Sequence, residues 1–214
     1  PWTEMHIEEN GNITPCCVMS SNIHFIANGI KNYRQSNKLK DIRESFLKNK
    51  KHPNCQFCWD AERNGVRTHR DSNKPDLSKL RKIHLRFNNI CNFKCRMCNP
   101  KFSSTWAEEN KIHKYFVHDY KLEKDIFEST EDLYKLILDN KDTLKQINIS
   151  GGEPLITKIN YRFLKFLIDN NLTHIGVAYS TNLSQIDYNG IDLVPLFNKF
   201  KSVTLNVSVD GYGK

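Results

Sequence analysis

The sequence predicts an α/β fold. We expect an incomplete parallel α/β barrel over residues 80–214, preceded by a small irregular cysteine-bearing segment over residues 1–79. From residue 82 onward, strand-like and helix-like patterns alternate, which is typical of parallel strands joined by crossover helices. Within those strands apolar and polar residues also alternate, whereas parallel strands buried on both faces are continuously apolar. A barrel with helices outside and a polar lumen fits both observations.

The first segment contains many turn and loop signals, including "ENGN", "PCC", "KHPNCQFCWD" and "DSNKP". One helix is predicted over 38–49, because Leu39, Ile42, Phe46 and Leu47 fall on one face. The stretch "DSNKPDLS" at 71–78 has the composition of a linker. We therefore place a domain boundary near residue 79.

The second segment is predicted to contain four strands with helices between them. The strands are "KIHLRFN" (82–88), "QINIS" (146–150), "HIGVAYS" (174–180) and "SVTLNVSVD" (202–210). The helices are predicted over 105–117, 130–140, 158–169 and 191–199. Thr105 and Glu108 have the spacing of a capping box at the start of the first of these helices.

Polar groups follow each of the four predicted strands. Three clustered cysteines follow the first, "SGGEP" (150–154) the second, "YSTN" (179–182) the third and "VSVDG" (207–211) the fourth. In parallel α/β barrels the active site lies at the carboxyl ends of the strands. The placement predicts an enzyme that binds a polar ligand there.

Composition limits the classes of protein and of partner. Of the 214 residues, 38% are hydrophobic and 26% charged, which suits a folded soluble protein. There is no apolar run of 18 residues and no signal-peptide pattern, so neither a membrane nor export is expected. The net charge of +8 favours an anionic partner, although dispersed lysines are also typical of a solvated surface. Seven cysteines without an export signal predict metal binding in a reducing cytoplasm.

The loop "NNICNFKCRMCNP" (88–100) places Cys91, Cys95 and Cys98 within eight residues. Three thiolates in one loop suit an iron–sulfur cluster with one iron left open, because a structural zinc site takes four protein ligands. Lys94 and Arg96 offset the negative charge, and Phe93 and Met97 are expected to pack against the cluster. The alternative is a zinc knuckle with a distant fourth ligand such as His84.

The spacing of these cysteines, together with "SGGEP", "STN" and "SVDG", resembles the radical S-adenosylmethionine (SAM) superfamily over about 80–214. Met97 departs from the aromatic residue that many members have before the last cysteine, and a thioether also packs there. The resemblance implies a partial (β/α)6 barrel. It also implies that Cys91, Cys95 and Cys98 bind three irons of a [4Fe-4S] cluster, whose fourth iron is chelated by the methionine moiety of SAM.

The resemblance also implies roles for the other strand ends. Gly151 and Gly152 would let the backbone approach SAM, and Glu153 would orient its amine. Ser180, Asn182, Ser208 and Asp210 are candidates for the methionine carboxylate and the ribose hydroxyls. Reductive cleavage of SAM would yield a 5′-deoxyadenosyl radical that abstracts hydrogen from a substrate, with an electron donor such as flavodoxin or ferredoxin. A peptide or protein is the leading substrate hypothesis. Nucleotide or sugar-derived substrates are the alternatives, and the basic charge suits an anionic molecule.

A second group of cysteines lies in the first segment. Cys55 and Cys58 have the spacing of a metal knuckle, and Cys16 and Cys17 add two thiolates. With "PW", "PCC" and "CQFCWDAERNGVRTHR", this segment resembles the SPASM and twitch extensions of radical SAM enzymes, although those extensions usually follow the barrel. The resemblance implies an auxiliary iron–sulfur cluster, with zinc as the alternative.

The chain begins at Pro1, and four strands cannot close a barrel of six, so we expect a fragment or a barrel that partners complete. Two other classes of protein stay open. One is a zinc-binding module that holds nucleic acid through its lysines. The other is a two-cluster electron carrier. Neither explains "SGGEP" or the polar strand ends.

Overall fold

The computed structural model describes residues 2–19, 23–25, 29–68, 79–117 and 131–209, and its main feature is one seven-stranded sheet with the order β3-β2-β1-β4-β5-β6-β9. The strands are β1 (Glu4–Ile7), β2 (Asn12–Thr14), β3 (His24–Phe25), β4 (Lys82–Arg86), β5 (Gln146–Ser150), β6 (Gly176–Thr181) and β9 (Val203–Val207). The four predicted strands are confirmed as β4, β5, β6 and β9, which pair in parallel. The linker predicted at 71–78 lies outside the described residues.

The first segment is more regular than its sequence suggests. Strand β1 pairs in parallel with β4, with His6 opposite His84, and β2 and β3 continue the sheet antiparallel. The expectation of a mainly irregular segment was therefore wrong, because strands of two to four residues are too short for a periodic signal. Residues on both sides of the predicted boundary share one sheet, and separate folding of the two parts stays a prediction.

The apolar and polar alternation is confirmed on β4 and β5, whereas on β6 the successive residues Val177, Ala178 and Tyr179 are all buried. Ile83 and Leu85 of β4 and Ile147 and Ile149 of β5 are fully buried, whereas the residues between them are partly exposed. The buried set belongs to one continuous core that also includes residues of α5 (Glu131–Asp139) and α6 (Lys158–Asp169). Removing each of these side chains from water contributes about 1.5–3 kcal/mol. The polar set is left on the face away from these helices.

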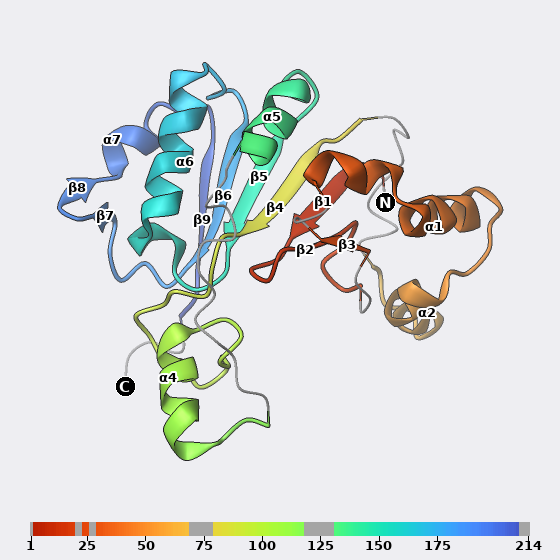
Figure 1. Cartoon of the computed structure of the whole chain (residues 1–214), viewed down its shortest axis with the longest axis horizontal. Coiled ribbons are helices and arrows are strands. Elements are labelled where there is room, and N and C mark those ends of the chain that lie inside the picture. The colour runs from red at the N-terminus through yellow and green to blue at the C-terminus, as the bar shows by residue number, and fades with distance from the viewer. Residues whose placement is uncertain (1, 20–22, 26–28, 69–78, 118–130, 210–214) are drawn as a thin grey trace.

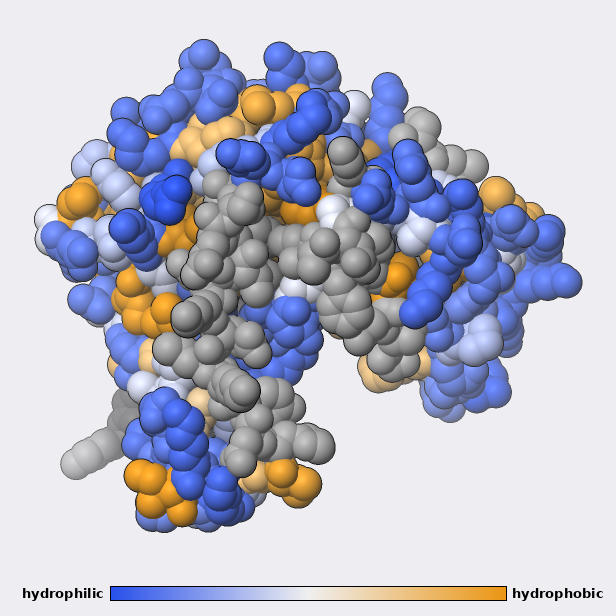
Figure 2. Space-filling model, in the orientation of Figure 1, coloured by the Kyte–Doolittle hydropathy of each residue, from blue (hydrophilic) through white to orange (hydrophobic). Residues whose placement is uncertain are grey.

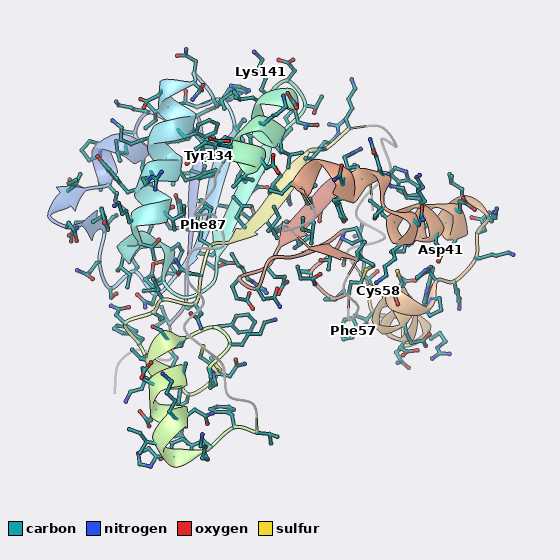
Figure 3. All side chains as sticks on the ribbon, viewed as in Figure 1. Asp41, Phe57, Cys58, Phe87, Tyr134 and Lys141 are labelled. Carbon is teal, nitrogen blue, oxygen red and sulfur yellow. The ribbon has the colours of Figure 1, made fainter. Side chains whose placement is uncertain are left out.

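Helices α5 and α6 lie side by side along one face of the sheet (Figure 1). Aromatic contacts join them, since the rings of Tyr134 and Phe166 are stacked with centroids 3.7 Å apart. Phe87, just after β4, meets Phe163 of α6 edge to face at 5.4 Å. Figure 3 labels Tyr134 and Phe87 in this layer. The helices therefore cover the apolar face, as the pattern predicts.

The remaining helices are shorter than predicted or were missed. The helix predicted over 105–117 is α4 (Ser104–His113), and the one over 191–199 is α7 (Val194–Phe197), which follows the strand pair β7 (Asp187–Tyr188) and β8 (Ile191–Asp192). The first segment contains α1 (Asn37–Leu47), as predicted over 38–49, and also α2 (Gln56–Arg63), which was not predicted. The described residues also include the short 3-10 helices η2 (Ile30–Gln35), η3 (Pro53–Cys55) and η4 (Pro154–Ile156).

The predicted capping box of α4 was wrong. The N-cap is Ser103, whose hydroxyl accepts a hydrogen bond from the Trp106 N–H at 3.3 Å. The Thr105 hydroxyl instead donates to the Phe93 carbonyl at 2.7 Å. The Thr105 hydroxyl, which the sequence pattern assigned to the helix cap, is therefore bound to a carbonyl of the cysteine loop.

The surface in Figure 2 is mostly hydrophilic, with hydrophobic groups at the far end of the lobe that carries α4. Ile112, Tyr115 and Val117 are exposed apolar side chains in and after α4, and Phe93 and Met97 of the cysteine loop are exposed as well. Within the described part of the chain, no helix is both long and apolar enough to cross a membrane.

Candidate functional site

The cysteine loop joins the end of β4 to α4, which projects from the edge of the sheet where β4 ends (Figure 1). The start of α4 holds this loop. The Ser104 hydroxyl accepts from the Cys91 N–H at 3.1 Å and donates to the Cys91 carbonyl at 3.2 Å, and the Ser104 N–H donates to the Asn89 carbonyl at 2.7 Å. The backbone that carries the first cysteine is thus fixed on both sides.

The middle of the loop is held in the same way. The hydroxyl of Ser103 donates to the Phe93 carbonyl at 2.8 Å, and the indole N–H of Trp106 donates to the Cys95 carbonyl at 3.0 Å. The Cys98 N–H donates to the Cys95 carbonyl at 2.9 Å, which closes a turn between these two cysteines. The three cysteines are therefore presented on a loop whose carbonyls are bound by α4.

A pocket of about 510 Å³ lies beside this loop. Residues from the carboxyl ends of β4, β5, β6 and β9 line it together with the loop. The predicted site residues that line it are Cys91, Cys95, Cys98, Gly151, Gly152, Ser180, Asn182 and Ser208. Four strand ends that are far apart in the sequence thus meet at one cavity. Asp210 lies outside the described residues.

Seven further pocket residues were not among the predicted site residues: Arg86, Phe93, Met97, Asn99, Phe102, Ser150 and Thr181. Thr181 lies within the "YSTN" stretch and Arg86 within the polar set of the first strand, so the strand-end rule alone could have found both. Phe102, which follows the cysteine loop, carries no such sequence signal. The Arg86 guanidinium carbon lies 4.9 Å from the centre of the Phe102 ring, so a cation–π contact forms part of the pocket wall.

The two glycines of "SGGEP" have positive φ, 85° for Gly151 and 48° for Gly152. A Cβ atom on Gly152 would lie 2.1 Å from the Ile90 carbonyl oxygen, and one on Gly151 would lie 3.0 Å from the Asn88 carbonyl oxygen. The Glu153 N–H donates to that Ile90 carbonyl at 2.7 Å. Glycine is therefore required for the end of β5 to pass directly against the backbone that leads into Cys91.

Glu153 is fully buried and is not part of the pocket wall. Its carboxylate accepts from the Leu155 N–H at 3.0 Å, the Thr181 hydroxyl at 2.7 Å and the Asn182 N–H at 2.6 Å. Three donors compensate a buried charge, which would otherwise be costly. The structure thus places this carboxylate behind the pocket, where it ties the end of β5 to the end of β6. Its contact with the amine of SAM stays a prediction.

Asn182 connects the third strand end to the cysteine loop. Its side-chain amide donates to the Asn92 side-chain oxygen at 3.1 Å and lies 4.0 Å from the Cys91 sulfur. The Asn92 amide in turn donates to the Ser184 hydroxyl at 2.8 Å. These contacts position Asn182 at the first cysteine, whichever ligand the pocket takes.

Two acidic residues of the first segment, Glu8 and Glu9, form ion pairs with basic residues at the pocket and the cysteine loop. Glu8 accepts from Arg86 at 2.8 Å and from Lys101 at 3.2 Å, and the nearly buried Glu9 lies 3.4 Å from Lys101. Burial raises the pKa of Glu9 above its ordinary value, and Lys101 acts in the opposite direction. Burial likewise raises the pKa of Cys91, while the Phe93 N–H, 3.5 Å from its sulfur, lowers it. A metal ion that binds the Cys91 sulfur must therefore displace the thiol proton in a partly buried environment.

The spacing of the three loop sulfurs bears on which metal they fit. Among the described side chains, Glu4, His6 and His84 are the group of three whose possible ligand atoms all lie within 4.8 Å of one another, and the loop cysteines do not form such a group. Thiolates on one zinc ion lie about 3.8 Å apart. A wider spacing suits a cluster, in which each cysteine binds its own iron. His84, the alternative fourth zinc ligand, lies beside Glu4 and His6.

The second set of cysteines lies on the side of the molecule that carries β2, β3 and α2; Figure 3 labels Cys58 on α2. Cys16 and Cys17 follow β2, and their thiols interact. This hydrogen bond lowers the pKa of Cys16 to about 6 and raises that of Cys17. Among the described side chains, the sulfurs of the four cysteines Cys16, Cys17, Cys55 and Cys58 do not all lie within 4.8 Å of one another. A shared metal site there stays a prediction.

Comparison with known proteins agrees with the geometry of the pocket. The family model of the radical SAM superfamily matches residues 85–214. Two curated relatives are also similar to parts of the chain. A protein named GTP 3′,8-cyclase from Campylobacter lari is 33% identical over 104 residues, which is 48% of this chain and 27% of the relative. One with the same name from Aliarcobacter butzleri is 29% identical over 128 residues, 58% of this chain and 32% of the relative.

The chain thus spans about a third or less of the length of these curated relatives. No solved structure shows significant similarity to it. The family match nevertheless covers more than half of the chain and includes every strand end that lines the pocket. The chain belongs to the radical SAM superfamily, and this membership implies SAM and a [4Fe-4S] cluster and supports an enzyme.

Proposed function

We propose that the pocket beside the cysteine loop is the SAM site of a radical enzyme. The observation that carries the proposal is that the three cysteines, the two glycines and polar residues at the carboxyl ends of β6 and β9 line one cavity. Cys91, Cys95 and Cys98 would hold a [4Fe-4S] cluster. When bound, such a cluster supplies the electron that cleaves the SAM sulfonium, and the resulting 5′-deoxyadenosyl radical abstracts hydrogen from a substrate.

The protein contributes position and charge to this chemistry. The α4 contacts to the Cys91 and Cys95 backbone hold two of the three thiolates in place before any ligand binds. Asn182, fixed through Glu153 and Asn92, offers polar groups beside Cys91 for the methionine moiety of SAM. Ser180 on β6 and Ser208 just after the neighbouring strand β9 offer hydroxyls for the SAM carboxylate or ribose, and Asp210 is the remaining candidate.

Glu153 acts as a positioning residue in this proposal. Because its carboxylate is buried and fully used by donors from Leu155, Thr181 and Asn182, it orients the polar side chains that face the pocket. Arg86 is oriented by Glu8 in a similar way and leaves part of its guanidinium on the pocket wall. Its charge suits an anionic group of SAM or of the substrate.

Two substrate classes compete. The curated relatives carry the name GTP 3′,8-cyclase, which favours a purine nucleoside triphosphate, and the net charge of +8 suits such an anion. The resemblance of the first segment to SPASM and twitch extensions favours a peptide or protein. In either case we propose an auxiliary cluster on Cys16, Cys17, Cys55 and Cys58, with zinc as the alternative metal.

The experiment is a SAM-cleavage assay on anaerobically reconstituted protein. Iron and sulfide are counted, and dithionite and SAM are then added while 5′-deoxyadenosine is measured by chromatography. We expect about four irons for the loop cluster and about eight when the auxiliary cluster forms. Cys95→Ala should remove four irons and all cleavage. Iron loading without any 5′-deoxyadenosine would favour an electron carrier, and zinc in place of iron would favour a binding module.

Substrate class is then tested with the active protein. GTP and a mixed peptide library are added separately, and the rate of 5′-deoxyadenosine formation is compared with the rate without substrate. The substrate class that raises the rate is supported. An Arg86→Gln variant should lose the stimulation by an anionic substrate more than the basal cleavage, whereas equal losses would place Arg86 at SAM itself.

A further inference from the structure

Outside the pocket, one group of side chains has the composition of a metal site. Glu4 and His6 lie on β1 and His84 on β4, and the parallel register places His6 directly opposite His84. Their ligand atoms all lie within 4.8 Å of one another. Residues two apart on a strand share a face, so Glu4 adjoins the two imidazoles. Two imidazoles and one carboxylate are ligands that suit divalent transition metals.

The two histidines lack ordinary partners at the atoms that converge. His6 is only 5% exposed, and its Nε2 is buried without a hydrogen-bond partner among the described residues. The same holds for Nε2 of His84. The carboxylate oxygen of Glu4 lies 3.6 Å from the first of these nitrogens and 3.9 Å from the second, beyond hydrogen-bond distance. A buried polar atom without a partner costs about 1–3 kcal/mol, so two such atoms side by side require an explanation.

A bound ion accounts for both atoms. Ligand atoms around a tetrahedral zinc ion lie about 3.3 Å apart, so the carboxylate needs to approach the imidazoles by only about half an ångström. The imidazole rings are now stacked with centroids 3.8 Å apart and an angle of 11° between planes. Ion binding therefore also requires them to rotate about the Cβ–Cγ bond until their lone pairs converge. The Glu4 and His84 side chains are 23% and 27% exposed, which leaves a path for the ion.

The surroundings of His84 support this assignment. Asn148 lies on the neighbouring strand β5, and its side-chain amide is 3.2 Å from Nδ1 of His84. The oxygen and nitrogen of an amide exchange places by a half-turn. With the oxygen toward the ring, Nδ1–H donates and the lone pair of Nε2 is free. An outer hydrogen bond of this kind is typical of metal-binding histidines.

We propose that Glu4, His6 and His84 bind one divalent transition-metal ion that joins β1 to β4. None of the three lines the cysteine pocket, so the ion is separate from the proposed SAM chemistry. Its position between neighbouring strands gives it a structural role, in which it fastens the first segment to β4 of the parallel sheet. Water fills the fourth position.

The test uses zinc as the probe and the reconstituted protein, so that iron already occupies the thiolates. After dialysis against zinc and then against metal-free buffer, zinc is counted by mass spectrometry and its ligands are identified by X-ray absorption. We expect one zinc per chain with imidazole and oxygen ligands about 2.0–2.2 Å from the metal. His6→Gln and His84→Gln should each weaken binding at least about tenfold, and Asn148→Leu about 10–100-fold.

His174→Gln is the matched control, because His174 is exposed and its ring is bonded to the Lys141 carbonyl instead. This variant should retain zinc. Thermal unfolding in EDTA shows whether each variant folds. If a histidine variant does not fold, Glu4→Gln replaces it in the zinc-binding test, because the Glu4 side chain is partly exposed. The proposal is overturned by an all-sulfur zinc shell, by zinc binding that is equal in the histidine variants and the control, or by no retained zinc.

Discussion

Gly152 is the position where a single methyl group should disturb the site most. Its φ is +48°, and a Cβ atom would lie 2.1 Å from the oxygen and 2.7 Å from the carbon of the Ile90 carbonyl. Both are backbone atoms of the residue before Cys91, so no flexible side chain can move aside. The Ile90 carbonyl must retreat by about 0.9 Å, the difference between the 2.1 Å contact and the 3.0 Å limit that real Cβ atoms keep.

The cost of Gly152→Ala follows from this displacement. Overpacking in a closely packed region costs about 1–3 kcal/mol. Breaking the bond from the Glu153 N–H to Ile90 adds about 0.5–1.5 kcal/mol. Forcing a residue with a Cβ into the left-handed region costs about 1–2 kcal/mol more. The first two costs, together about 1.5–4.5 kcal/mol, arise from the contact with the cysteine loop.

Gly65→Ala is the matched control for this experiment. Gly65 also has a positive φ, +74°, and a Cβ atom there would have no neighbour within 4 Å. It therefore carries the cost of the left-handed conformation without the clash. In thermal unfolding of the reconstituted protein, Gly152→Ala should melt about 3–18 °C below Gly65→Ala, since 1 kcal/mol corresponds to about 2–4 °C for a chain of this size. It should also bind less iron per chain.

Equal melting temperatures and equal iron contents for the two variants would refute the reasoning. That result would mean that the end of β5 does not press against residue 90. A lower melting temperature with full iron loading would limit the role of the glycine to stability.

Three further predictions test neighbouring contacts. Glu153→Gln replaces one accepting oxygen with a donor that faces the Asn182 N–H, so we expect SAM affinity, measured by equilibrium dialysis, to fall about tenfold, whereas unchanged affinity would contradict a positioning role. Burial lowers the pKa of His84 from 6.5 to about 3, so between pH 6.5 and 3 the unfolded chain binds a proton that the folded chain does not. In metal-free buffer the free energy of unfolding should therefore decline as pH falls through this range, by at most about 1.4 kcal/mol per pH unit. Urea denaturation at several pH values measures this, and His84→Asn should make the dependence on pH weaker. Trp106→Phe removes the indole bond to the Cys95 carbonyl and should destabilise the protein by about 1 kcal/mol and speed cluster loss in air, measured by the decay of cluster absorbance; an unchanged decay would show that this bond does not steady the loop.

Local sequence patterns predicted much of the fold. The alternation in "KIHLRFN" and "QINIS" reports directly which side chains face the core, because successive residues on a strand point to opposite faces. The helix over 158–169 was predicted at its observed bounds for a similar reason, since its apolar residues recur at helical spacing. Capping was less predictable, because the hydroxyls of Ser103 and Thr105 also bind a carbonyl of the preceding loop.

The sequence by itself determined the class of fold, the residues at the strand ends and the resemblance to a radical SAM protein, because each is expressed in short-range spacing. Only the tertiary structure decided that β1 extends the same sheet, that Glu153 lies behind the pocket rather than in its wall, and that Glu4 and His6 meet His84. The first and third of these facts depend on pairing between segments more than 70 residues apart, and the second depends on burial. Neither strand register nor the supply of hydrogen-bond donors to a buried carboxylate is encoded in the neighbouring residues of the chain.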